Sequence, residues 1–150
     1  MNVRSKTLAH EPSTQWYKKS ANIFRNPEID SCGLKPVLVL EDQVLIAMYV
    51  EELLREAGYR DIVTYSSCAA ASKWLDHNKP LIVVMETKLR DGLCDDVAAD
   101  LAERGIPFIV HTVERDGSGT HPGLNARCRW IVKPCDADEF VTTVKEHALV

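Results

Sequence analysis

Polar side chains suited to phosphate and metal chemistry follow four of the apolar segments in this sequence. They are Glu41, Asp42, Glu86, Thr112 and Lys133. Three carboxylates gathered at one point repel one another unless they share a cation, and oxygen ligands favour a hard divalent ion such as Mg²⁺. A hydroxyl group and an ammonium group facing the same point would add two donors for phosphate oxygens. The residue types therefore predict a phosphate-related site, provided that the fold brings them together.

The elements that would position these side chains are short apolar runs that alternate with helical periods. Residues 37–40 form a continuous apolar run, which is typical of a strand buried on both faces. Ile46, Val50 and Leu54 then lie on one stripe of a helix that ends at Gly58. The same alternation continues, with strands expected at 61–65, 81–85, 107–110 and 130–132.

Helices are expected between all of these strands and after the last one. Ser66 or Ser67 can cap the second helix, and Asp136 with Glu139 forms a capping box for the last. The stretch 114–125 contains three glycines and one proline, so any helix there should be short or irregular.

This order predicts an α/β fold of the flavodoxin-like type. Strands separated by helices pair in parallel through right-handed crossovers, which gives a doubly wound, five-stranded parallel sheet. We expect the (βα)5 strand order 2-1-3-4-5. In such sheets ligands bind at the carboxyl ends of the strands, where the polar side chains would gather.

The chain of 150 residues is long enough for one domain, which we expect at 36–150. Residues 1–35 lack apolar periodicity and carry a net charge of +3, whereas the remainder carries −7. This segment is interpreted as a poorly ordered N-terminal extension. The alternative is a docking segment, because Trp16, Tyr17 and Phe24 lie among lysines and could bind a partner or the domain itself.

Composition excludes several classes of protein. The acidic domain lacks the clustered Lys and Arg of a nucleic-acid surface, and no apolar run is long enough to span a membrane. The five cysteines lie far apart in the sequence without a C-x-x-C pair, so we interpret them as reduced structural thiols and expect a cytoplasmic protein.

The set of strand-end residues resembles the receiver domain of two-component response regulators, over about residues 35–150. The matching residues are the acidic pair Glu41-Asp42, the Thr112 hydroxyl and Lys133-Pro134. The resemblance implies that the acidic pair holds Mg²⁺, with Asp42 the more direct ligand, and that Thr112 and Lys133 contact a phosphoryl group. It also implies a cis Lys133-Pro134 bond, and a Trp130 ring that swings between two positions together with the threonine.

One residue departs from the family pattern. The family's phosphoacceptor aspartate ends the third strand, and here that position is Glu86. The extra methylene moves the carboxylate by about 1–1.5 Å, and a misplacement of this size can cost roughly 100-fold in rate. We therefore expect an atypical receiver that binds Mg²⁺ weakly, if at all, through Glu41, Asp42 and Glu86, and whose Glu86 partly imitates the phosphorylated state.

The predicted function is that of a stand-alone receiver domain, not an enzyme, that acts through protein–protein contacts. The expected partners are a histidine kinase or phosphotransfer protein and a downstream protein target, with no direct DNA or membrane binding; a homodimer is left open. One alternative is an active phosphorelay receiver that tolerates Glu86. A less favoured one is a Mg²⁺-dependent phosphatase on the same fold.

Overall fold

The computed structural model describes residues 35–113 and 128–148. The predicted extension at 1–35, apart from Lys35, and the irregular stretch expected at 114–125 lie outside these residues, so both remain predictions. No helix within the described part of the chain is long and apolar enough to cross a membrane.

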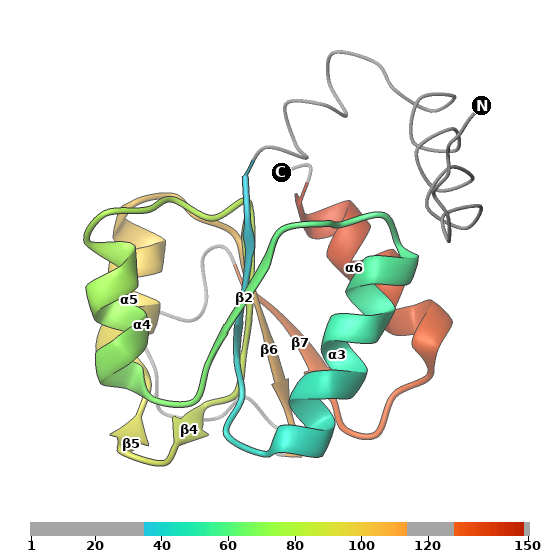
Figure 1. The fold of residues 1–150 in the computed structure, drawn as a ribbon, viewed down its shortest axis with the longest axis horizontal. Helices are drawn as coiled ribbons and strands as arrows, with labels where there is room; N and C mark the ends of the chain where they lie inside the picture. Colours follow the sequence, from blue (N-terminus) through green and yellow to red (C-terminus); the bar gives the residue numbers. More distant parts are fainter. Residues whose placement is uncertain (1–34, 114–127, 149–150) are drawn as a thin grey trace, which may run out of the picture. The chain divides into compact units, whose positions relative to one another are not determined.

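The described residues form a parallel sheet of five strands in the order β2-β1-β3-β6-β7 (Figure 1). The strands are β1 (Val37–Leu40), β2 (Ile62–Tyr65), β3 (Ile82–Met85), β6 (Phe108–Thr112) and β7 (Cys128–Val132). Numbered along the chain, this is the order 2-1-3-4-5, which confirms the predicted flavodoxin-like fold.

Helices cover both faces of the sheet. They are α3 (Val44–Glu56), α4 (Cys68–Leu75), α5 (Asp95–Glu103) and α6 (Ala137–Ala148). Figure 1 shows α3 and α6 on one side of the strands, and α4 and α5 on the other. Because side chains alternate along a strand, each sheet face contributes to a different core. Leu38, Val83 and Phe108 pack toward α4 and α5, whereas Val39, Val84 and Ile109 pack toward α3 and α6.

The predicted helix boundaries agree with local chemistry. The Ser67 hydroxyl accepts a hydrogen bond from the backbone N–H of Ala70 at 3.1 Å and caps α4. The Asp136 carboxylate, directly before α6, accepts a hydrogen bond from the backbone N–H of Glu139 at 3.0 Å. Gly58 follows α3 with a φ of 105°, a left-handed conformation that glycine adopts without steric cost.

Two features differ from the sequence prediction. The fourth strand continues to Thr112 because β6 stays paired with β7 through Thr112 and Val132, so the threonine ends the strand instead of following it. A small antiparallel hairpin, β4 (Lys88–Leu89) and β5 (Gly92–Leu93), precedes α5 where no strand was predicted.

Candidate functional site

The parallel pairing places the predicted residues at one edge of the sheet. Leu40 pairs with Met85, so Glu41 and Glu86 emerge from adjacent strands at the same level. The backbone N–H of Glu86 donates to the carbonyl of Leu40 at 3.0 Å, which continues that pairing. Between β6 and β7, the N–H of Lys133 donates to the carbonyl of Thr112 at 2.7 Å.

Three of these side chains form an ion-pair cluster, which we call the Glu–Lys–Glu cluster (Glu41, Glu86 and Lys133). The Lys133 Nζ lies 2.7 Å from Glu41 Oε1 and 2.8 Å from Glu86 Oε1. The Lys133 side chain is 10% exposed, that of Glu41 is 4% exposed and that of Glu86 is 15% exposed. The ammonium group therefore bridges two carboxylates in a site that is largely closed to water.

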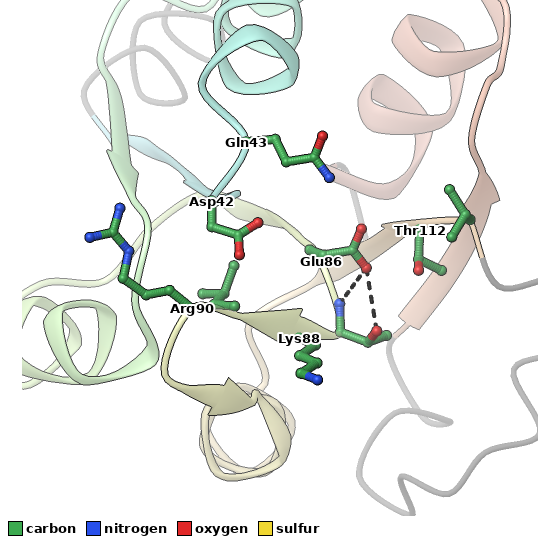
Figure 2. Close-up of a pocket in the computed structure, with 9 residues that line it drawn as sticks. Asp42, Gln43, Glu86, Lys88, Arg90 and Thr112 are labelled. Carbon is green, nitrogen blue, oxygen red and sulfur yellow. Dashed lines mark hydrogen bonds between the residues drawn. The ribbon is translucent and has the colours of Figure 1, made fainter.

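The second oxygen of each glutamate in the cluster is also hydrogen-bonded. Glu41 Oε2 accepts from the backbone N–H of Gln43 at 3.1 Å. Glu86 Oε2 accepts from the backbone N–H of Thr87 at 2.8 Å and from the Thr87 hydroxyl at 3.3 Å (Figure 2). Both oxygens of each carboxylate thus have protein donors, which is how buried charges are usually satisfied.

These contacts stabilise the charged form of each partner. Burial alone would raise the pKa of Glu86, but hydrogen bonds from Lys133, Thr112 and Thr87 outweigh it and hold the pKa below its ordinary value. Burial alone would lower the pKa of Lys133, but its two carboxylate partners outweigh that effect and raise it. Both Glu86 and Lys133 are therefore ionised at neutral pH.

An open cleft of about 450 Å³ lies beside the cluster. Asp42 and Glu86 face it from the ends of β1 and β3, and Thr112 faces it from β6 (Figure 2). The exposed side chains of Lys88 and Arg90 line its other wall. Asp42 makes no hydrogen bond or ion pair with any residue of the described ranges, in contrast to both glutamates.

The Lys133-Pro134 peptide bond is cis, as the resemblance implied. Trp130 is half-buried in β7 and packs against the core on the α4 and α5 face. His111 is 6% exposed and packs edge-on against Phe140, with ring centroids 5.3 Å apart. Its burial, reinforced by the charge of Lys133, lowers the pKa of His111 to about 4, so the ring is a neutral packing residue at pH 7.

Known proteins resemble this chain in sequence and in fold. No family model matches the sequence. The transcriptional regulatory protein PdtaR of Mycobacterium tuberculosis is 29% identical over an alignment of 123 residues that covers 79% of this chain and 58% of that relative. The chain thus spans little more than half the length of this curated relative.

Solved structures match over about three quarters of the chain. SdrG from Sphingomonas melonis is 27% identical with a TM-score of 0.63, covering 77% of this chain and 97% of its own. A second structure is the receiver domain of a sensor histidine kinase from Pseudomonas aeruginosa, which has a magnesium ion in its active-site cleft. It is 17% identical with a TM-score of 0.67, and the match covers 77% of this chain and 98% of that domain. The fold is that of a response-regulator receiver domain.

The residues at this edge of the sheet, as arranged, do not form a ready magnesium site. Among residues 35–113 and 128–148, no three His, Cys, Asp or Glu side chains are grouped to hold a metal. Of the predicted ligands, Glu41 and Glu86 are engaged by Lys133, and only Asp42 presents a carboxylate without a partner. Two of the three predicted carboxylate ligands are thus engaged in the Glu–Lys–Glu cluster, where the ammonium group supplies compensating positive charge, and the magnesium site stays a prediction.

Sequence reasoning placed the strand ends of the sheet but missed part of the side-chain geometry beside them. It assigned Glu41 to a metal and did not predict its ion pair with Lys133. It also missed the Thr87 donors to Glu86, for which the only sequence signal is the position directly after the strand-end acid.

Proposed function

We propose that this chain is a receiver module of two-component signalling in which Glu86 occupies the phosphoacceptor position. The observation that carries the proposal is the 2.8 Å contact between Glu86 Oε1 and Lys133 Nζ. The lysine that would hold a phosphoryl oxygen already holds a carboxylate of the protein. The hydrogen bond from the Thr112 hydroxyl, which helps to lower the pKa of Glu86, reaches the same carboxylate.

This arrangement disfavours phosphoryl transfer to Glu86. A carboxylate that attacks phosphorus must give up hydrogen bonds to its attacking oxygen, and a nearby cation must neutralise the incoming phosphoryl group. Here both oxygens of Glu86 accept hydrogen bonds, and Lys133 divides its charge between two glutamates. The proposed module is therefore a pseudo-receiver, neither an active phosphorelay receiver nor an enzyme.

The same contacts favour an active-like state without phosphate. Lys133 and Thr112 interact with Glu86 as they would with a phosphoryl group, so the Glu86 carboxylate partly mimics that group. A bias of about 1.4 kcal/mol shifts a two-state equilibrium tenfold, which an ion pair of modest strength can supply. In this proposal Trp130 lies turned inward and switches together with Thr112.

Output would pass through protein contacts. Exposed apolar side chains cluster at the start of α3, next to the cleft: Val44 at 70%, Leu45 at 80%, Met48 at 59% and Tyr49 at 50% exposure. Such a patch beside a receiver site suits a protein partner. We propose a histidine kinase or phosphotransfer protein upstream and a protein target downstream, in the cytoplasm, with no direct DNA contact. A homodimer is left open, and sedimentation velocity would distinguish it from a monomer.

The test is incubation of the parent and of Glu86→Asp with a small acyl phosphate in Mg²⁺, followed by mass spectrometry. We expect no phosphate on the parent and a phosphorylated side chain at position 86 of the variant, together with a Trp fluorescence change that the parent lacks. Glu86→Gln serves as the control, because it keeps the length of the side chain but removes the nucleophile.

Three outcomes contradict the proposal. Phosphate on Glu86 of the parent would establish an active phosphorelay receiver. A Glu86→Asp variant that stays unlabelled although Mg²⁺ is bound would mean that the acceptor residue is not what prevents transfer. Turnover of a generic phosphomonoester by the parent would instead support the phosphatase alternative.

A further inference from the structure

Two cysteines that are distant in the sequence meet beside the site. Cys68 is the first residue of α4, and Cys94 follows β5 directly before α5. Their Sγ atoms lie 3.0 Å apart although 26 positions separate them in the chain. Both are free thiols.

The backbone around the two thiols is held in place by further contacts. The Asp91 carboxylate accepts hydrogen bonds from the N–H groups of Cys68 at 2.8 Å and Ala69 at 3.0 Å. The Cys68 Sγ also lies 3.6 Å from the carbonyl oxygens of Gly92 and Leu93. The β4–β5 hairpin is therefore fastened to the first turn of α4, and this junction keeps the sulfur atoms together.

The two thiols differ in exposure. Cys68 is half-buried, whereas Cys94 is 2% exposed and belongs to the core on the α4 and α5 face. A reagent from solvent therefore reaches Cys68 first, and Cys94 is positioned to react with whatever forms there. This is the arrangement of an attacked cysteine and a resolving cysteine.

We propose that Cys68 and Cys94 are a redox modification site that forms an intramolecular disulfide with a low-molecular-weight disulfide as the oxidant. The Cys68 thiolate attacks the oxidant, breaks its S–S bond and forms a mixed disulfide, and the first small thiol leaves with one proton. The Cys94 thiolate then attacks the Cys68 sulfur, and the second small thiol leaves with another proton. The two cysteines lose two electrons, and the oxidant gains them.

The reaction should be slow. Burial raises the pKa of both thiols, and for Cys68 this outweighs the lowering effect of its Cys94 neighbour. Few thiolates are therefore present at neutral pH, and thiolates are the reacting species. The pair would respond to sustained oxidation and not to a brief pulse of oxidant.

A disulfide here would restrict one wall of the cleft. Lys88 and Arg90 in the hairpin line the cleft, and Thr87, directly before the hairpin, holds the Glu86 carboxylate. Fixing the hairpin to α4 covalently would reduce local opening of this segment, because a cross-link removes open conformations. Whether Glu86 accepts phosphate has no bearing on this inference.

The experiment uses the full chain incubated with excess oxidised glutathione, then alkylated and digested with trypsin without reduction. We expect a cross-linked product joining the tryptic peptides 61–73 and 91–104, each of which contains a single cysteine. Hydrogen exchange of amides 88–94 should slow, and the melting temperature should rise by several degrees relative to the reduced protein. Cys135→Ala, which alters another half-buried thiol, should leave the cross-link unchanged.

Several results would overturn the proposal. They are stable glutathione on Cys68 with Cys94 still alkylated, a cross-link between other cysteines in its place, or full alkylation of both residues after prolonged oxidation. In Cys94→Ala we expect glutathione to stay on Cys68, since nothing resolves it. If that variant is unfolded, the parent's cross-linked peptide still decides the question.

Discussion

Replacing Lys133 with methionine should destabilise the domain strongly, because it removes the cation from two buried carboxylates. Lys133 Nζ is the partner of Glu41 at 2.7 Å and of Glu86 at 2.8 Å, and methionine keeps much of the apolar stem of the side chain. Removing one partner of a buried ion pair costs about 3–5 kcal/mol, since the remaining charge stays uncompensated. Glu86 is the more exposed of the two acids, so we expect a loss of about 3 kcal/mol at pH 7, at the lower end of that range.

The assay is urea unfolding followed by far-UV circular dichroism, at pH 7 and at pH 5. An unpaired buried carboxylate takes up a proton more readily, so the difference in free energy of unfolding between parent and variant should shrink at the lower pH. Lys145→Met is the matched control: it removes an exposed lysine of α6 that lies outside the cluster, and it should change stability by less than about 0.5 kcal/mol.

A triple variant distinguishes the loss of charge compensation from the loss of side-chain packing. The triple variant Lys133→Met, Glu41→Gln and Glu86→Gln removes all three charges, and we expect it to regain a large part of the loss. If Lys133→Met alone costs under about 1 kcal/mol at pH 7, the cluster behaves like a surface ion pair and the reasoning from burial is refuted.

Three further predictions concern residues around the cluster. Asp42→Asn should raise the melting temperature in the absence of metal, by the equivalent of about 0.5–1 kcal/mol, because its unpartnered carboxylate faces a second acid across the cleft; an unchanged or lower melting temperature would contradict this. Calorimetric titration should give millimolar rather than micromolar affinity for Mg²⁺, because the ion must compete with Lys133 for Glu41 and Glu86; micromolar affinity would refute this. Because His111 has a folded pKa of about 4 against an ordinary value of 6.5, the unfolded state binds the proton first, and stability should fall by about 2 kcal/mol between pH 7 and pH 5. The His111→Gln variant should lose that part of the pH dependence. An equal slope of unfolding free energy against pH in parent and variant would contradict the prediction for His111.

The sequence predicted those features that depend on periodicity and strand order. The apolar run at 37–40 and the helical stripe through Val50 and Leu54 predict buried side chains. The structure places these side chains in the two cores of the sheet. The carboxyl ends of parallel strands must share an edge, so Glu41 and Glu86 were expected together before any side-chain position was known.

The features that the sequence did not predict depend on side-chain geometry across long separations. Which oxygens Lys133 contacts is decided by its rotamer and by the depth of burial, neither of which leaves a sequence pattern. The contact of Cys68 with Cys94 is similarly invisible, because it follows from how the hairpin lies on α4. The hairpin itself had a local signal in Asp91-Gly92, and Gly92 adopts a φ of 129° there.

The two ion pairs of Lys133 also bear on the order in which the chain assembles. They span 92 and 47 positions, so the lysine emerges from the ribosome well after both glutamates. Until β7 docks on β6, Glu41 and Glu86 lie next to each other without this cation, and their repulsion opposes early closure of the β1–β3 edge. Contacts of such long range form late and slow folding. Charge compensation at the site would thus coincide with the arrival of the last strand, and nascent chains that end before it would leave this edge of the sheet loosely held.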